Sequence, residues 1–268
     1  MRKLKRNAVK RTLIILSMLF VNALILSAGE DYARKVFWTS DGDSLLYRVL
    51  EPQNPERGKQ YPLILFLHGA GERGNDNQSQ LIHGSQMFLN PVNREKHPAF
   101  VLFPQCPSDG YWSFSKRPDS FENMPAEEVM PPIIENLKEL LDHYLANPMV
   151  DKSRVYIMGL SMGGMATYDI VSRFPEIFAA AIPICGAVKV GRLDAAKDVK
   201  FRIYHGDADS VVPVECSRSA YRELKAAGAD VEYFEFPGCG HGSWNPAFSR
   251  DDFMEWLFKQ KKSRKYLK

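Results

Sequence analysis

A serine at position 161 lies in a sequence pattern that could make it a nucleophile. It is the middle residue of the pentapeptide G-L-S-M-G at 159–163, which directly follows the apolar run 155–158. A serine on such a strand-to-helix turn needs a strained backbone, and small residues two positions before and after it let the chain pass without clashes. Its Oγ would be exposed at the strand end, and the backbone N–H of Met162 would point toward a developing oxyanion.

Candidates for an acid and a base follow in chain order. The strand-like run 201–205 leads into a loop with Asp207 and Asp209, and the alternating run 231–236 leads into a loop with His241. Taken alone, a loop aspartate is typical of a turn or a helix cap, and a histidine beside glycines is typical of a surface. The order serine, aspartate, histidine, each after a strand, instead favours a nucleophile activated by an oriented base.

The glycine-rich stretch 68–75 is a third candidate for chemistry. It follows the run 61–67, whose nearly continuous apolar character suits a central parallel strand. Its three glycines allow a backbone to approach a ligand closely. No G-K-[ST] follows, which excludes a phosphate-binding P-loop.

Together these phrases resemble the α/β-hydrolase superfamily, and more narrowly its compact bacterial esterases grouped with predicted peptidases, dienelactone hydrolases, and polyhydroxybutyrate depolymerase-like and feruloyl esterases. The phrases are LHGAGERG at 67–74, FPQCP at 103–107, GLSMGG at 159–164, PICG at 183–186, HGDADSVVP at 205–213 and GHGSW at 240–244. The resemblance implies that Asp209, rather than Asp207, completes a triad with Ser161 and His241. It also implies that Ala70 supplies a second oxyanion N–H beside that of Met162.

The hydropathy pattern predicts an α/β fold with a mostly parallel central sheet and helices on both faces. A hairpin is expected at 37–40 and 45–49, then core strands near 62–67, 99–104, 154–159, 179–184, 201–205 and 231–236, with helices near 133–144, 162–174 and 215–227 and a last one burying Phe253, Trp256 and Leu257. Such alternation implies right-handed crossovers. With no linker or repeat and no segment long enough for a large lid, residues 30–268 are expected to form one catalytic domain.

The amino terminus has the order of an export signal. Residues 1–11 carry six basic and no acidic side chains, residues 13–26 are apolar, and Ser27-Ala28-Gly29 offers small residues for cleavage. This order predicts a signal peptide over 1–29 and a periplasmic or secreted enzyme without stable membrane association once the leader is cleaved. The alternative is an uncleaved anchor, although the apolar run is near the minimum for spanning and Asn22 interrupts it.

Charge and cysteine content restrict the possible partners. The formal net charge is +3, so removing the six basic leader residues leaves about −3, and nothing then indicates nucleic-acid binding. No C-x-x-C or His/Cys cluster indicates a metal, and no cofactor is expected. The four cysteines permit at most two disulfides. A bond between Cys216 and Cys239 is one alternative, and free thiols at both positions are the other.

We therefore expect a serine carboxylic-ester hydrolase that acts through an acyl-enzyme on small-molecule or polysaccharide-linked esters. Trp112, its neighbours Tyr111 and Phe114, and Trp244 are candidate walls for an aromatic acyl group or a sugar, the alternative for each being ordinary packing. Two other classes stay open. One is a serine peptidase of the prolyl-oligopeptidase kind, and the other is a binding protein that has lost catalysis on the same fold.

Overall fold

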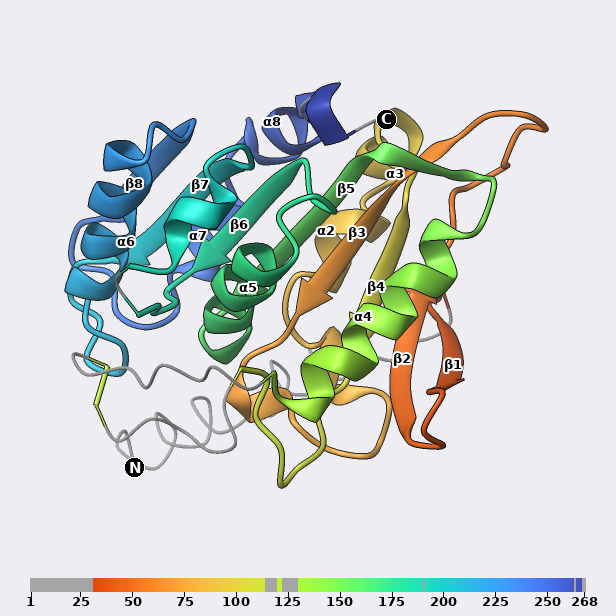
Figure 1. Cartoon of the computed structure of the whole chain (residues 1–268), viewed down its shortest axis with the longest axis horizontal. Coiled ribbons are helices and arrows are strands. Elements are labelled where there is room, and N and C mark those ends of the chain that lie inside the picture. The colour runs from red at the N-terminus through yellow and green to blue at the C-terminus, as the bar shows by residue number, and fades with distance from the viewer. Residues whose placement is uncertain (1–30, 114–119, 122–129, 190, 263, 267–268) are drawn as a thin grey trace, which may run out of the picture.

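In the part of the chain that the structure describes, eight strands form one sheet in the order β1-β2-β4-β3-β5-β6-β7-β8 (Figure 1). The computed structural model describes residues 31–113, 120–121, 130–189, 191–262 and 264–266. The strands are β1 (Ala33–Trp38), β2 (Ser44–Leu50), β3 (Tyr61–Leu67), β4 (Phe100–Pro104), β5 (Val150–Leu160), β6 (Ala180–Ile184), β7 (Lys200–Gly206) and β8 (Val231–Phe236). The helices are α2 (Ser85–Leu89), α3 (Pro91–Lys96), α4 (Pro132–Leu145), α5 (Met162–Arg173), α6 (Glu215–Ala226), α7 (Trp244–Phe248) and α8 (Phe253–Lys259), with 3₁₀ turns at Ala70–Glu72, Ser79–Leu81, Leu193–Ala196 and Arg264–Tyr266.

The sheet is mostly parallel, as predicted. Strands β1 and β2 form the expected antiparallel hairpin, and β2 pairs antiparallel with β4. Every pair from β4 through β8 is parallel. Parallel neighbours end at the same edge of a sheet, so the loops after β3, β5, β7 and β8 meet at one edge. Each of these loops carries a candidate site residue.

The central strands are apolar along their length because both faces of the sheet are covered. In β3, Leu63, Leu65 and Leu67 pack on one face and Ile64 and Phe66 on the other, which is the period-two alternation of a strand. The first face is covered by α4, α5 and α6, and the second by α2, α7 and α8 (Figure 1). The prediction of helices on both faces is confirmed.

Some expectations fall outside the described residues. The leader 1–29 does, and so do 114–119 and 122–129, so the absence of a large lid stays an expectation. Within the described residues, no helix has the length and apolar character needed to cross a membrane. All four cysteines lie in the described residues, and none of them, Cys216 and Cys239 included, is in a disulfide bond.

Candidate active site

The backbone at Ser161 is strained, with φ 53° and ψ −116° at the junction of β5 and α5. A non-glycine residue rarely adopts positive φ, and such strain persists only where surrounding structure fixes it. Here the Ser161 N–H donates to the Ile184 carbonyl oxygen at 2.9 Å. Glycine is required two residues later, because a Cβ at Gly163 would lie 2.0 Å from the Leu67 carbonyl oxygen. The first turn of α5 therefore lies directly against the end of β3.

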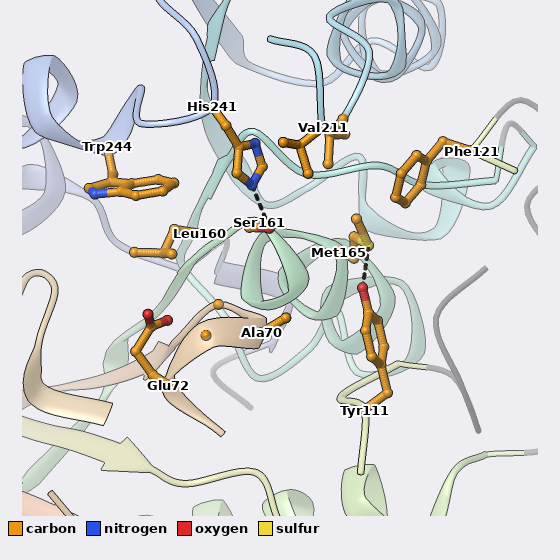
Figure 2. Close-up of a pocket in the computed structure, with 13 residues that line it drawn as sticks. Ala70, Glu72, Tyr111, Phe121, Leu160, Ser161, Met165, Val211, His241 and Trp244 are labelled. Carbon is orange, nitrogen blue, oxygen red and sulfur yellow. Dashed lines mark hydrogen bonds between the residues drawn. The ribbon is translucent and has the colours of Figure 1, made fainter. Parts of the chain in front are cut away.

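The structure brings Ser161, His241 and Asp209 into one hydrogen-bonded chain. His241 Nε2 lies 2.9 Å from Ser161 Oγ, and His241 Nδ1 lies 2.7 Å from Asp209 Oδ2. Figure 2 shows the imidazole directed at the serine from above. With the carboxylate accepting the Nδ1–H, Nε2 is left to accept the serine hydroxyl proton. This is the arrangement in which a histidine activates a serine for nucleophilic attack.

Asp209 is held by four hydrogen-bond donors. Its side chain is fully buried, and Oδ1 accepts from the backbone N–H groups of Val211 and Val212 at 2.8 and 3.0 Å. A second histidine, the buried His205, places Nε2 at 3.2 Å from Oδ2. Burial alone would raise the pKa of Asp209, but hydrogen bonds from His205, His241 and the two backbone amides outweigh it and hold the pKa well below its ordinary value. The group beside His241 is therefore a stable carboxylate.

The neighbouring acid has a different position. Asp207 is exposed, and its Oδ1 accepts from the Gly238 backbone N–H at 2.6 Å. The same two loops are joined by the Ala208 N–H, which donates to the Cys239 carbonyl oxygen at 3.0 Å. A Cβ at Gly206 would lie only 2.2 Å from that oxygen. Asp207 thus joins the loop after β7 to the loop after β8, and Asp209 is the acid that contacts the histidine.

A buried histidine holds the loop that contains Ala70. His68 donates from Nδ1 to the Gly69 carbonyl oxygen at 2.6 Å and accepts the Cys106 N–H at Nε2, 3.0 Å away. Burial lowers the pKa of His68 to about 4, so the ring is neutral at pH 7 and can play both parts. Trp112 donates its indole N–H to the His68 carbonyl oxygen at 3.1 Å. Ala70 follows this anchor and lines the pocket that contains Ser161 (Figure 2).

The expectation that Trp112 forms a substrate wall is wrong. Its side chain is fully buried in the core, where the indole N–H donates to the His68 carbonyl oxygen in the loop after β3. Trp244 does line the pocket, with its ring centroid 5.6 Å from that of His241. Tyr111, one residue before Trp112, lines it as well. Phe114 lies outside the described residues.

The pocket beside Ser161 has a volume of about 320 Å³. Much of its wall is apolar and was not expected from the sequence, namely Phe121, Leu160, Met165, Val211 and Val212. Glu72, also unexpected, contributes a carboxylate. An acidic residue within the glycine-rich stretch was the one signal that could have indicated it. This cavity is at the small end of ligand sites and suits a compact acyl or aryl group.

One group of potential metal ligands overlaps the triad. Ligand atoms of Cys185, Asp209 and His241 lie within 4.8 Å of one another. Asp209 and His241 already bond each other, and burial raises the pKa of the Cys185 thiol to about 12. Because a thiol must lose its proton to bind a metal, this donor set fits an acid–base pair better than a metal centre.

A strained serine on a sharp strand-to-helix turn, at the carboxyl edge of a mostly parallel sheet and bonded to a His–Asp pair, defines an α/β-hydrolase. The chain belongs to the phospholipase/carboxylesterase family, whose sequence profile matches residues 49–252. It is 25% identical over 216 residues to a probable carboxylesterase SOBER1-like of Arabidopsis thaliana, covering 74% of this chain and 78% of that protein.

Two further relatives agree with this membership. Identity to poly(3-hydroxyalkanoate) depolymerase C of Paucimonas lemoignei is 27% over 190 residues, covering 69% of this chain but 42% of that protein. The crystal structure of a thermostable esterase superposes with a TM-score of 0.76 at 38% identity. That match covers 87% of this chain and 64% of the esterase, so the chain spans just under two thirds of its length. The chain is a carboxylesterase-like hydrolase.

Proposed function

We propose that the protein hydrolyses carboxylic esters through a covalent acyl-enzyme on Ser161. The continuous hydrogen-bonded path from Asp209 through His241 to Ser161 carries the proposal. His241 takes the hydroxyl proton as Ser161 attacks the ester carbonyl, and then returns it to the departing alcohol. Water attacks the acyl-enzyme by the same route in reverse. Asp209 keeps the imidazole in the productive tautomer and stabilises its protonated form.

Two backbone N–H groups are assigned to the oxyanion, those of Ala70 and Met162. Ala70 opens a 3₁₀ turn that lines the pocket, and Met162 is the first residue of α5. The amino end of a helix carries unpaired N–H groups and a partial positive charge, which favour a negative oxygen there. Removing one oxyanion donor typically costs about 10²- to 10³-fold in kcat.

For substrates, we propose small acyl or aryl esters, carbohydrate-linked esters among them. The compact volume and the aromatic side chains of Tyr111, Phe121 and Trp244 support a planar group or a sugar ring against the wall. We further propose that the enzyme works in the periplasm or outside the cell after cleavage of residues 1–29, from their basic, apolar, small order. Cell fractionation with amino-terminal sequencing tests this, and an intact Met1 on a membrane-bound product would contradict it.

The chemistry is tested with purified enzyme and a substrate panel of acetyl, feruloyl and longer-acyl p-nitrophenyl esters beside aminoacyl amides. We expect turnover of the short or aryl esters and covalent labelling by a fluorophosphonate, both lost in Ser161→Ala. Cleavage of the amides with little ester turnover would indicate a serine peptidase instead. No labelling of the folded wild-type protein would indicate a binding protein on a hydrolase fold.

A further inference from the structure

Among the described residues that line the pocket, Glu72 is the one with a carboxylate. Glu72 ends the 3₁₀ turn that begins at Ala70, and its side chain is only 11% exposed. Figure 2 shows the carboxylate rising from the side of Ala70 toward the part of the cavity bounded by Leu160 and Trp244. Nothing in the proposed ester hydrolysis uses it.

Within the described part of the chain, this carboxylate has no close charged partner. Of the basic side chains that the structure describes, His83 alone is within 4 Å, and its Nε2 lies 3.6 Å from Glu72 Oε1, beyond hydrogen-bond distance. Burial lowers the pKa of His83 and outweighs the opposing effect of Glu72, so the ring is predominantly neutral at pH 7. The adjacent Arg73 donates elsewhere, to the carbonyl oxygens of Ala70 and Gly110 at 3.0 Å each.

No described residue donates a hydrogen bond to this carboxylate, which lines the pocket, so a bound group with a hydroxyl or ammonium could donate one to it. The pocket wall next to Glu72 also offers an aromatic face. The Trp244 ring lies 5.0 Å from the His83 ring and 5.6 Å from the His241 ring, between centroids. Trp244 therefore connects the Glu72–His83 pair to the triad, so a group bound at Glu72 would belong to a substrate whose ester is at Ser161.

We propose that Glu72, His83 and Trp244 form a specificity subsite for a hydrogen-bond-donating group of the substrate, either a hydroxyl or an ammonium. Glu72 accepts the hydrogen bond, and the carbon skeleton beside the donor packs on the indole of Trp244. The subsite rests on the proposed ester hydrolysis but takes no part in bond making. A hydrogen bond to a charged group corresponds to about ten- to a hundredfold in kcat/KM.

The test compares three acetate esters built on six-membered rings. Cyclohexyl acetate has no donor, a monoacetylated methyl xyloside has hydroxyls, and trans-4-aminocyclohexyl acetate has an ammonium. The enzymes are wild type, Glu72→Leu, Glu72→Gln and the control Glu56→Leu, which replaces an exposed glutamate paired with Lys59. We expect Glu72→Leu to lower kcat/KM for at least one donor-bearing ester by about ten- to a hundredfold relative to cyclohexyl acetate, with no such change in the control.

Glu72→Gln distinguishes the two donors, because it keeps an acceptor oxygen and removes the charge. An ammonium substrate should lose as much kcat/KM in Glu72→Gln as in Glu72→Leu, whereas a hydroxyl substrate should keep most of it. The proposal is overturned if Glu72→Leu lowers kcat/KM equally for all three esters or for none of them, since Glu72 would then only support the loop of Ala70. If Glu72→Leu is misfolded, as judged by loss of fluorophosphonate labelling, Glu72→Met takes its place, because its unbranched side chain also lacks the acceptor oxygens, and its kcat/KM values are judged by the same criteria. Absence of wild-type turnover of all three esters, by contrast, would count against the proposed ester hydrolysis itself.

Discussion

Replacing Asp209 with asparagine puts the proposed triad to its sharpest test. The two carboxylate oxygens face different sets of donors, Oδ1 the backbone N–H groups of Val211 and Val212, and Oδ2 the side chains of His205 and His241. An amide has one acceptor oxygen and one donor nitrogen. In Asp209→Asn, the NH₂ group replaces one of the two oxygens. It then faces either the two backbone N–H groups, which can accept nothing from it, or the two histidines, where it forces His241 into the opposite tautomer.

The expected loss follows from the tautomer. If the NH₂ faces His241, Nδ1 must become the acceptor and Nε2 carries the hydrogen, so Nε2 can no longer accept the proton of Ser161. A triad held in the wrong tautomer loses about ten-thousandfold in kcat, which is about 5 kcal/mol of transition-state stabilisation. If the amide turns the other way, two backbone N–H groups lose their acceptor, and each hydrogen bond to a charged group is worth about 1.5–3 kcal/mol of stability.

Asp207→Asn is the matched control, because Asp207 uses one oxygen to accept the Gly238 N–H and an amide oxygen can do the same. We expect it to stay within about tenfold of wild type in kcat, since one neutral hydrogen bond replaces one charged one. The assay is steady-state hydrolysis of p-nitrophenyl acetate, with urea unfolding of each variant to show that the proteins are folded. A smaller loss for Asp209→Asn than for Asp207→Asn would refute the assignment of the acid.

Further predictions concern the nucleophile, the turn and pH. Ser161→Ala should lower kcat by several powers of ten and shift the Tm by no more than about 3 °C, because no core cavity forms; near-wild-type rates would contradict the triad. Gly163→Ala should fail to fold or melt at a much lower temperature than wild type, because its Cβ would lie 2.0 Å from the Leu67 carbonyl oxygen. The control Gly71→Ala, whose Cβ would have no atom within 4 Å, should melt close to the wild-type temperature in the same thermal scan. The lowered pKa of Asp209 adds stability that is complete above the unfolded pKa of about 3.9 and is lost as the pH falls toward the folded value. Urea unfolding between about pH 3 and 6 should therefore show falling stability below about pH 4, with a shallower fall in Asp209→Asn than in wild type.

The sheet could be predicted from the sequence because each parallel strand is a mostly apolar run of residues that is followed by a polar or glycine-rich loop. The range expected for β8, 231–236, matches the structure, and α5 begins at Met162 as predicted. Strand β5 was expected from 154 and begins at Val150. The ladder shifts register between Tyr61 and Leu63, and Ser153 bonds back to Asp151, so the first residues of β5 lack the regular pattern of a strand.

The walls of the pocket could not be predicted in the same way. Tyr111 and Trp112 are neighbours in the sequence and both are buried, but only Tyr111 lines the pocket, because the indole N–H of Trp112 is bonded to the His68 carbonyl oxygen. Glu72 reaches the pocket through a three-residue turn that has no periodicity to detect. The short helices α2, α3 and α7 span five or six residues each, less than two turns, so their apolar spacing carries no signal.

The contact between the loops after β7 and β8 has a mechanical consequence. One link joins main-chain atoms, the Ala208 N–H and the Cys239 carbonyl oxygen, and the Asp207 carboxylate adds a second link to the Gly238 N–H. Asp209 and His241 can therefore move as a single rigid piece when the rim of the pocket fluctuates. Such a motion would change the distance between His241 Nε2 and Ser161 Oγ, which is 2.9 Å here, while the bond between His241 and Asp209 is kept.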